Sequence, residues 1–280
     1  MCAIDNSSRA QERFAQLQGI VRSLGSVLVA FSGGVDSTFL LKVAVDTLHE
    51  NALAVLAQSP TLPAHDRVDA LAMIEHLGAR SMVIEGNEMS NASFVRNDRK
   101  RCYWCKRGLF ESLNEIAGRE GLKAVIEGSN SDDTSDYRPG LAAARELGIR
   151  SPLMEAGLTK DDIRLLSREL GLPTWNKPAS ACLSSRIPYG TPIDESMLQH
   201  IDAAEDVLRG LGFAQVRVRH HGDVARIEVS DDDMPRLLEK ALRREIAAQF
   251  RELGYVYTTI DAEGYRTGSM NKTILEPEQP

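Results

Sequence analysis

The chain has 280 residues, 42% of them hydrophobic and 26% charged, a composition typical of globular proteins that form one large domain or, as we expect here, two. Its net charge of −7 argues against wholesale wrapping of nucleic acid. No stretch approaches the length of a membrane span and residues 1–11 lack a signal-peptide pattern, so we expect a cytoplasmic protein that does not bind a membrane. Four cysteines are too few for a disulfide framework, which favours reduced, catalytic or metal-binding thiols.

A predicted strand, a glycine turn and a helix follow one another near the N-terminus. Residues 27–31 form an apolar run rich in β-branched side chains, as expected of a parallel strand covered on both faces. Residues 32–38, Ser-Gly-Gly-Val-Asp-Ser-Thr, predict a turn whose amide groups converge at the positive end of a helix. The spacing and lysine of a Walker A loop are absent. The motif resembles instead the pyrophosphate loop of the N-type ATP pyrophosphatases, although a Gly-Gly turn that merely joins strand to helix is the simpler alternative.

Strands and helices are predicted to alternate through the first part of the chain. We expect an α/β fold with a parallel sheet and helices on both faces. The glycine turn, residues 58–63 and the loop after residue 127 would then meet at the carboxyl end of the sheet. The strands are expected at 27–31, 52–57, 81–85 and 122–127, and the helices at 8–24, 36–44, 66–77, 106–119 and 159–170.

The loop at residues 127–140 contains three aspartates followed by Tyr-Arg. One interpretation is a solvated turn, because Asn, Asp, Ser and Gly favour turns anyway. The other is a site for Mg²⁺ and ATP, because hard cations bind carboxylate oxygens while bridging phosphates. The position after a strand favours the second interpretation.

The pattern changes after an irregular segment at residues 172–192. A helix at 195–211, a hairpin of alternating strands at 214–219 and 224–229, a long helix at 231–250 and a strand at 255–260 predict a small α+β domain with one exposed sheet face. We therefore divide the chain into a first domain at 1–189, a second at 190–275 that helps close the site, and a tail at 276–280.

Three of the four cysteines have sequence neighbours that favour a chemical role. Cys102 and Cys105 form a C-x-x-C expected just before a helix, with five nearby cations that favour thiolates. Cys182 follows 77 residues later (182 − 105) in a Ser/Pro-rich loop beside Arg186, whereas Cys2 is terminal and incidental. Three thiolates are one short of a zinc tetrad but suit a [4Fe–4S] cluster with one open iron. Redox disulfide chemistry and burial as small hydrophobes are the alternatives.

Several motifs in one order resemble the LarE family, ATP-dependent sulfur transferases that help build the nickel-pincer nucleotide cofactor of lactate racemase. The similarity runs from about residue 14 to residue 271. The glycine turn is shared with many PP-loop enzymes, whereas the cysteine loop and the Arg-Val-Arg strand are more specific. The motifs occupy residues 32–38, 127–140, 177–191, 216–228 and 264–271.

The resemblance implies that ATP adenylates a carboxylate of pyridinium-3,5-dicarboxylate mononucleotide, and that sulfur then displaces AMP to leave a thiocarboxylate. It implies Mg²⁺ at Asp36 and Asp132. Arg217 and Arg219, two apart on a strand, would project from one face and, with Arg186, bind the substrate phosphate or carboxylate; the alternative is a solvated strand face. The ATP-binding residues implied are Ser32, Gly33, Gly34, Asp36, Ser37, Thr38, Gly128, Asn130 and Arg138.

The resemblance also implies two possible sulfur sources. Cys182 aligns with the cysteine that some members consume, leaving dehydroalanine in the protein. Cluster-dependent members hold a [4Fe–4S] centre with three cysteines, which here would be Cys102, Cys105 and Cys182. The extra cysteine pair makes the cluster version our expectation.

Three rival functions belong to other classes. A PP-loop amidotransferase or NAD synthetase-like ammonia ligase would not need the three cysteines. A tRNA thiolase would bind tRNA with a steep salt dependence, which the net charge does not favour. A nucleotide-binding regulator would need no intact catalytic loop. For the expected sulfurtransferase, the partners are a small-molecule nucleotide substrate, further copies of the chain in a homo-oligomer, and other proteins of the same cofactor pathway that receive the product.

Overall fold

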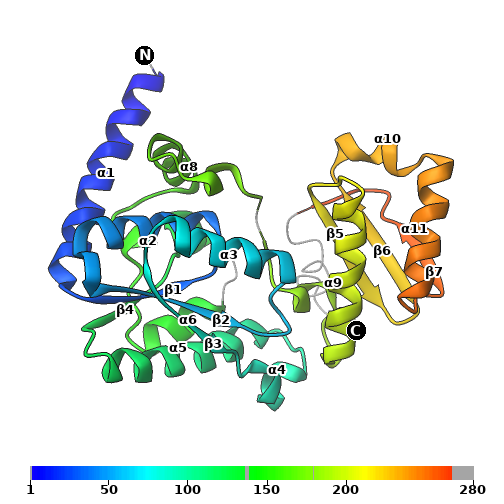
Figure 1. The fold of residues 1–280 in the computed structure, drawn as a ribbon, viewed down its shortest axis with the longest axis horizontal. Coiled ribbons are helices and arrows are strands. Elements are labelled where there is room, and N and C mark those ends of the chain that lie inside the picture. The colour runs from blue at the N-terminus through cyan, green and yellow to red at the C-terminus, as the bar shows by residue number, and fades with distance from the viewer. Residues whose placement is uncertain (1, 136–138, 179, 267–280) are drawn as a thin grey trace, which may run out of the picture. The chain divides into compact units, whose positions relative to one another are not determined.

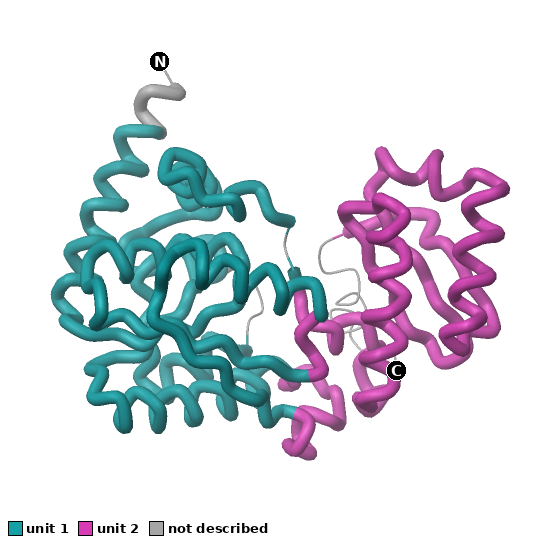
Figure 2. The backbone as a smooth tube through the Cα atoms, viewed as in Figure 1, with its two compact units in different colours: residues 1–59, 64–88, 102–180 teal, residues 60–63, 89–101, 181–280 magenta. Residues whose placement is uncertain are grey.

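The computed structural model describes residues 2–135, 139–178 and 180–266, which belong to two compact units (Figure 2). Each unit gathers segments that are distant in sequence. The predicted domain boundary at residue 189 stays a prediction. Unit 1 contains residues 1–59, 64–88 and 102–180, and unit 2 contains residues 60–63, 89–101 and 181–280.

Unit 1 is built on a four-stranded parallel sheet of order β3-β2-β1-β4. Val27 on β1 is paired with Ala52 on β2 and with Ala124 on β4. Because parallel strands end at the same edge, the loops that follow β1 and β4 lie beside one another. The strands are β1 (Val27–Phe31), β2 (Ala52–Gln58), β3 (Arg80–Glu85) and β4 (Ala124–Ile126).

Helices cover both faces of this sheet, which confirms the predicted α/β fold (Figure 1). On one face, Phe110 and Leu113 of α5 pack in a cluster with Leu28 and Val55 of the strands. On the other face lie α2 and α3. The helices of unit 1 are α1 (Cys2–Leu24), α2 (Val35–Leu48), α3 (Ala64–His76), α5 (Arg101–Arg119, of which Arg101 belongs to unit 2), α6 (Pro139–Glu146), α7 (Pro152–Glu155) and α8 (Lys160–Glu169).

Unit 2 contains a smaller sheet of order β5-β6-β7. β5 and β6 form the predicted antiparallel hairpin, and β7 runs parallel to β6. Val218 and Ile227 of the hairpin pack in one apolar cluster with Leu208 of α9 and Phe250 of α11. The elements are α4 (Ala92–Val95), α9 (Glu195–Gly210), β5 (Val216–His221), β6 (Val224–Val229), α10 (Met234–Leu237), α11 (Lys240–Glu252) and β7 (Tyr257–Ile260).

The prediction that one face of this sheet is exposed to solvent is wrong for β5. Arg217 and Arg219, which alternate with the apolar residues of β5, are only 7% and 5% exposed. Alternation of polar and apolar residues therefore separates two buried faces, one apolar and one charged. The reason is that the charged face carries carboxylates as well as guanidiniums, so burial does not leave the arginines without counter-ions.

The prediction of a single helix at residues 231–250 is also wrong, because two separate helices, α10 and α11, lie in this range. α10 ends at Leu237, and Glu239 has an extended backbone (φ −60°, ψ 133°) before α11 begins. Pro235 has no N–H group and a restricted φ and is accommodated in the first turn of α10, so this helix starts at Met234 and not at Asp231. The break itself lies beyond the proline, at Glu239. A 3₁₀ turn capped by the side chain of Ser230 precedes α10.

Candidate active site

Hydroxyl groups close the loop between β1 and α2. Ser37, in the first turn of α2, turns its side chain back toward the loop. Its Oγ accepts a hydrogen bond from the backbone N–H of Ser32 (3.3 Å), lies 3.0 Å from Ser32 Oγ and donates to the carbonyl of Gly34 (3.3 Å). These contacts hold the loop as a tight turn at the N-terminus of α2.

The N-terminus of α2 presents hydrogen-bond donors. Its N-cap residue is Gly34, which makes no side-chain cap, so the amide groups of the first turn remain donors at the positive end of the helix dipole. Thr38 Oγ1 is buried and has no hydrogen-bond partner within the described parts of the chain. Both features support the prediction of a phosphate cradle, while the role of each residue stays a prediction.

The backbone conformation and close packing at position 33 require a glycine. Its φ of +71° is a conformation that residues with side chains rarely adopt, and an added Cβ would lie 2.7 Å from the Cβ of Ala70 on α3. Helix α3 therefore packs directly against the backbone of the glycine loop.

The loop after β4 forms a second wall beside α2. A Cβ on Gly128 would lie 3.0 Å from the backbone nitrogen of Ser37. Asn130 Nδ2 donates to Asp36 Oδ1 (3.4 Å), and the backbone N–H of Asn130 donates to the carboxylate of Asp133 (3.0 Å). The structure thus brings Gly128 and Asn130 to the glycine loop, as the sequence predicts, whereas Arg138 lies outside the described residues.

Lys160 contacts both predicted Mg²⁺ ligands, Asp36 and Asp132. It was not among the site residues predicted from the sequence. Its Nζ lies 2.6 Å from Asp36 Oδ2, and its backbone N–H donates to Asp132 Oδ2 (2.8 Å). Thr159 caps α8 at this point. No sequence pattern indicates this role, because Asp161 and Asp162 in the same first turn already offset the unfavourable position of a lysine at a helix N-terminus.

Unit 2 contains a buried ion pair next to Cys182. Arg186 and Glu205 are both fully buried and meet through two hydrogen bonds, at 2.8 and 2.9 Å. Glu205 also accepts from the backbone N–H of Val218 on β5 (3.0 Å). The other guanidinium nitrogen of Arg186 donates to the carbonyls of Ala181 (2.5 Å) and Cys182 (3.0 Å). Arg186 therefore links the backbone of the cysteine loop to the core of unit 2.

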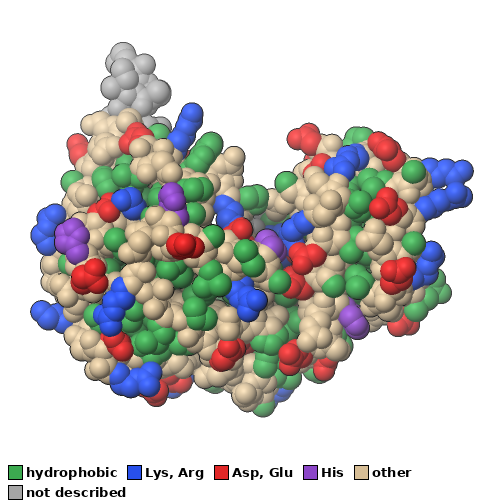
Figure 3. Space-filling model, viewed as in Figure 1, with side chains coloured by type: hydrophobic (Ala, Val, Ile, Leu, Met, Phe, Trp, Pro, Cys, Tyr) green, Lys and Arg blue, Asp and Glu red, His purple; other side chains and the backbone are tan. Residues whose placement is uncertain are grey.

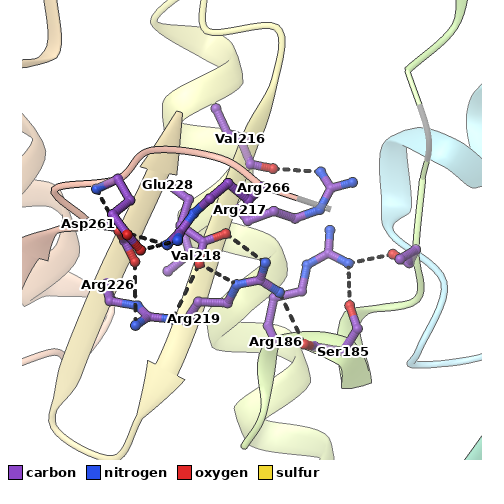
Figure 4. A network of polar contacts seen from close by, with 12 residues as sticks. Ser185, Arg186, Val216, Arg217, Val218, Arg219, Arg226, Glu228, Asp261 and Arg266 are labelled. Carbon is purple, nitrogen blue, oxygen red and sulfur yellow. Dashed lines mark hydrogen bonds and ion pairs between the residues drawn. The ribbon is translucent and has the colours of Figure 1, made fainter. Parts of the chain in front are cut away.

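Arg217 and Arg219 lie on the charged face of β5 (Figure 4). The carboxylate of Glu228 pairs with two guanidinium groups (Figure 4). Its Oε2 lies 2.6 Å from Arg219 Nη2, and its Oε1 lies 3.3 Å from Arg226 Nη2. Arg217 donates to the carbonyl of Val216 (2.6 Å). Burial and the neighbouring Arg186 guanidinium lower the pKa of Arg217, so a bound anion would be favourable there.

The C-x-x-C lies inside a helix and not before it, which corrects the expectation. α5 begins at Arg101, so Cys102 and Cys105 occupy its first two turns. They belong to unit 1, and Cys182 belongs to unit 2, where it precedes a 3₁₀ turn and its Sγ lies 3.0 Å from Ser184 Oγ. Cys102 and Cys182 are exposed and Cys105 is partly exposed.

The described residues contain no helix long and apolar enough to cross a membrane. On the face drawn in Figure 3, basic side chains are interspersed with acidic ones over both units. That face therefore offers no continuous basic surface of the kind that nucleic-acid binding uses.

Comparison with known proteins identifies relatives over nearly the whole chain. The family described as NAD synthase matches residues 11–102, the part that holds the glycine loop. An uncharacterized protein of Synechocystis sp. is 41% identical, over 95% of this chain and 99% of its own. The pyridinium-3,5-bisthiocarboxylic acid mononucleotide synthase of Lactiplantibacillus plantarum is 40% identical, over 94% of this chain and 95% of its own. An uncharacterized protein of Methanocaldococcus jannaschii is 28% identical over 86% of this chain and 91% of its own.

Gly33→Ala is expected to lower the free energy of unfolding of the ligand-free protein by about 1–3 kcal/mol, because alanine resists positive φ and its Cβ meets Ala70. Gly34→Ala is the control. Gly34 has a φ of −78°, and the nearest contact of an added Cβ is Ser32 Oγ at 3.6 Å, so we expect only the loss of about 0.5–1 kcal/mol that alanine causes at an N-cap. Urea denaturation compares the two, and equal losses would contradict the packing of α3 on the loop.

Glu205→Gln is expected to destabilise unit 2 by about 3–5 kcal/mol, because it leaves the buried Arg186 without a counter-ion. Asp206→Asn removes a neighbouring carboxylate that is half exposed, and should change stability by about 0.5 kcal/mol or less.

This difference should also depend on pH. Burial alone would raise the pKa of Glu205, but the Arg186 guanidinium and its neighbours lower it below the usual 4.5. The advantage of wild type is therefore fully present above pH 4.5 and shrinks as the pH falls below it. Denaturation at pH 7 and at acidic pH checks this, and a gap that widens in acid would contradict it.

Proposed function

The chain belongs to the LarE family, and on that premise we propose that it is an ATP-dependent, AMP-forming sulfurtransferase of nickel-pincer nucleotide cofactor biosynthesis. The substrate proposed is pyridinium-3,5-dicarboxylate mononucleotide. The observation that carries the proposal is the similarity to the Lactiplantibacillus plantarum synthase over 94% of the chain, which includes the cysteine loop and the arginine strand. The NAD synthase family covers only residues 11–102, which contain neither Cys182 nor Arg217, so an ammonia ligase has weaker support.

The adenylation step uses unit 1. The glycine loop from Ser32 to Thr38 would bind the phosphates of ATP, with amide donors from the first turn of α2. Gly128 and Asn130 would form the opposite wall. Asp36 and Asp132 would hold Mg²⁺, and both already contact Lys160, whose ammonium group would bind the phosphates alongside the metal ion. The substrate carboxylate attacks the α-phosphorus of ATP, pyrophosphate leaves and an acyl-adenylate remains.

Arg217, Arg219 and Arg186 would bind the phosphate or carboxylate groups of the substrate. The contacts give them different tasks. Arg186 and Arg219 make close ion pairs with Glu205 and Glu228, which hold their guanidinium planes in one orientation. Arg217 is the arginine whose charged form is disfavoured by its surroundings, so it would gain most from a bound anion.

The second step transfers sulfur. A sulfur nucleophile attacks the acyl carbon and AMP leaves. If the Cys182 thiolate is the nucleophile, a thioester forms; loss of the Cα proton and cleavage of the Cβ–S bond then release the thiocarboxylate and leave dehydroalanine at position 182.

A [4Fe–4S] cluster held by Cys102, Cys105 and Cys182 is our preferred sulfur source, and the donor chemistry of the chain fits it. Cys102 and Cys105 are three residues apart on α5, so their side chains lie on the same side of the helix. Both thiols have solvent access. Three thiolates leave one iron open, and a bound cluster would supply exchangeable sulfur in place of the cysteine.

The remaining expectations are proposals as well. The enzyme would act in the cytoplasm as a homo-oligomer, with the second domain contributing to assembly. It would pass its product to other proteins of the same cofactor pathway.

Substrate-dependent release of pyrophosphate from ATP tests the proposed function. We expect wild type to convert ATP to AMP and pyrophosphate only when the pyridinium dicarboxylate mononucleotide is present. Cys182→Ala should retain pyrophosphate release and lose the thiocarboxylate product, which mass spectrometry detects. An ammonia-dependent amide product, or release stimulated by tRNA and suppressed steeply by salt, would overturn the assignment.

Iron and acid-labile sulfide content of anaerobically reconstituted protein tests the cluster. We expect wild type and Cys2→Ser to hold iron and sulfide, and Cys102→Ser to lose them together with the visible absorption. If wild type holds no iron after reconstitution, the cluster is excluded. Cys182 is then the consumed donor, and the protein would lose the mass of one hydrogen sulfide per turnover.

A further inference from the structure

Asp66 is a buried carboxylate that the reaction above does not use. It lies in the first turn of α3 and is only 3% exposed. Lys177 Nζ lies 2.9 Å from its Oδ1, and the hydroxyl of Ser180 donates to its Oδ2. Burial opposes ionisation, but the hydrogen bonds from Ser180 and Lys177 lower the pKa of Asp66, so it carries a negative charge at neutral pH.

His65, the neighbour of Asp66 on α3, lies 3.5 Å from Asp66 Oδ1, but the partners Lys177 and Ser180 come shortly before the cysteine proposed to deliver sulfur. Lys177 and Ser180 come five and two residues before Cys182. Because a fully extended chain spans at most about 3.6 Å per residue, the Cα atom of Cys182 lies within about 7 Å of the Cα atom of Ser180. Contacts at Ser180 therefore restrict where Cys182 can be.

The same helix contacts the glycine loop. Ala70 is one turn after Asp66 on α3, so both lie on one side of the helix. Ala70 is the residue against which the backbone of Gly33 packs. α3 thus contacts both the loop proposed to bind ATP and Ser180, which lies two residues before Cys182 in the chain.

A purely local role for Asp66 does not account for these contacts. A carboxylate in the first turn stabilises a helix from an exposed position, and burial is not needed for that. Asp69 shows the contrast. It also pairs with Lys177, at 3.0 Å, but its side chain is 58% exposed.

We propose that Asp66 is a positioning residue for sulfur transfer, which anchors Lys177 and Ser180 to α3 and so restricts the positions that Cys182, two residues after Ser180, can reach during the reaction. The proposal rests on the proposed function, because it concerns the step in which Cys182 or its cluster delivers sulfur. Adenylation does not need Asp66, since the glycine loop and the loop after β4 have their own contacts. Loss of Asp66 should therefore separate the two half-reactions.

The test compares Asp66→Asn with Asp69→Asn in single-turnover reactions with MgATP and the pyridinium dicarboxylate mononucleotide. Pyrophosphate release and thiocarboxylate formation are measured separately. For Asp66→Asn we expect pyrophosphate release within about twofold of wild type and thiocarboxylate formation slowed about tenfold to hundredfold, the effect of a misplaced reacting group. Asp69→Asn should stay within about twofold in both, because exposed ion pairs contribute little.

Two further measurements exclude a merely structural effect. Ser180→Ala removes one contact of Asp66 and leaves its ion pair with Lys177 intact, so it should give the same separation of half-reactions to a smaller degree, even if Asp66→Asn folds poorly. The rate of alkylation of Cys182 by iodoacetamide, followed on its peptide, should rise in Asp66→Asn and stay unchanged in Asp69→Asn. This readout requires neither substrate nor turnover.

The possible outcomes distinguish this proposal from the proposed function. If wild type releases no pyrophosphate with the pyridinium substrate, the proposed function fails, and the alkylation rates still decide whether Asp66 positions Cys182. If wild type is active but Asp66→Asn forms thiocarboxylate at the wild-type rate, the positioning role is overturned. Equal slowing of both half-reactions also overturns it, because a general loss of structure gives that result.

Discussion

The backbone of Gly33 and helix α3 lie so close together that no side chain fits between them. This contact requires a glycine with positive φ in the loop and a small residue, Ala70, on the helix. Ser37 supports the same loop from within by bonding back to Ser32 and Gly34. The same helix, through Asp66, also contacts Lys177 and Ser180, which precede Cys182 in the chain.

Buried ion pairs between arginines and glutamates lie on one side of the hairpin in unit 2. The hairpin separates an apolar face, which packs on α9 and α11, from a face of arginines and carboxylates. Each close pair reduces the cost of burying its members, and Glu205 additionally bonds the edge of β5 through Val218. Arginines held in this way have little freedom to lose when an anion binds. This rigidity supports a substrate-binding role for the face, with Arg186 also holding the backbone of the cysteine loop.

The accuracy of the sequence predictions varied with the distance over which each feature is decided. The strand, glycine turn and helix at residues 27–48 could be predicted because their signals are local: an apolar run, two glycines and a helical period. The helix at 231–250 was wrong because it is divided at Glu239, where the backbone is extended and no proline or glycine indicates a break. The start of α5 was placed too late, at about residue 106, although Asp98 accepts a hydrogen bond from the backbone N–H of Lys100 just before the helix. Burial of Arg217 and Arg219 was missed because alternation identifies two faces without showing what covers the polar one.

Two of the residues that matter most for the site could not be found from sequence patterns. Lys160 and its partner Asp36 are 124 residues apart in the chain, and Asp66 and Ser180 are 114 apart. Taken singly, Lys160 and Asp66 are ordinary charged residues in the first turn of a helix.

The sequence by itself determined the fold class, the glycine loop and the resemblance to a sulfurtransferase family, because these depend on periodicity and short motifs. Only the tertiary structure decided which charges are buried and paired, because an ion pair depends on how segments far apart in the chain approach and exclude water.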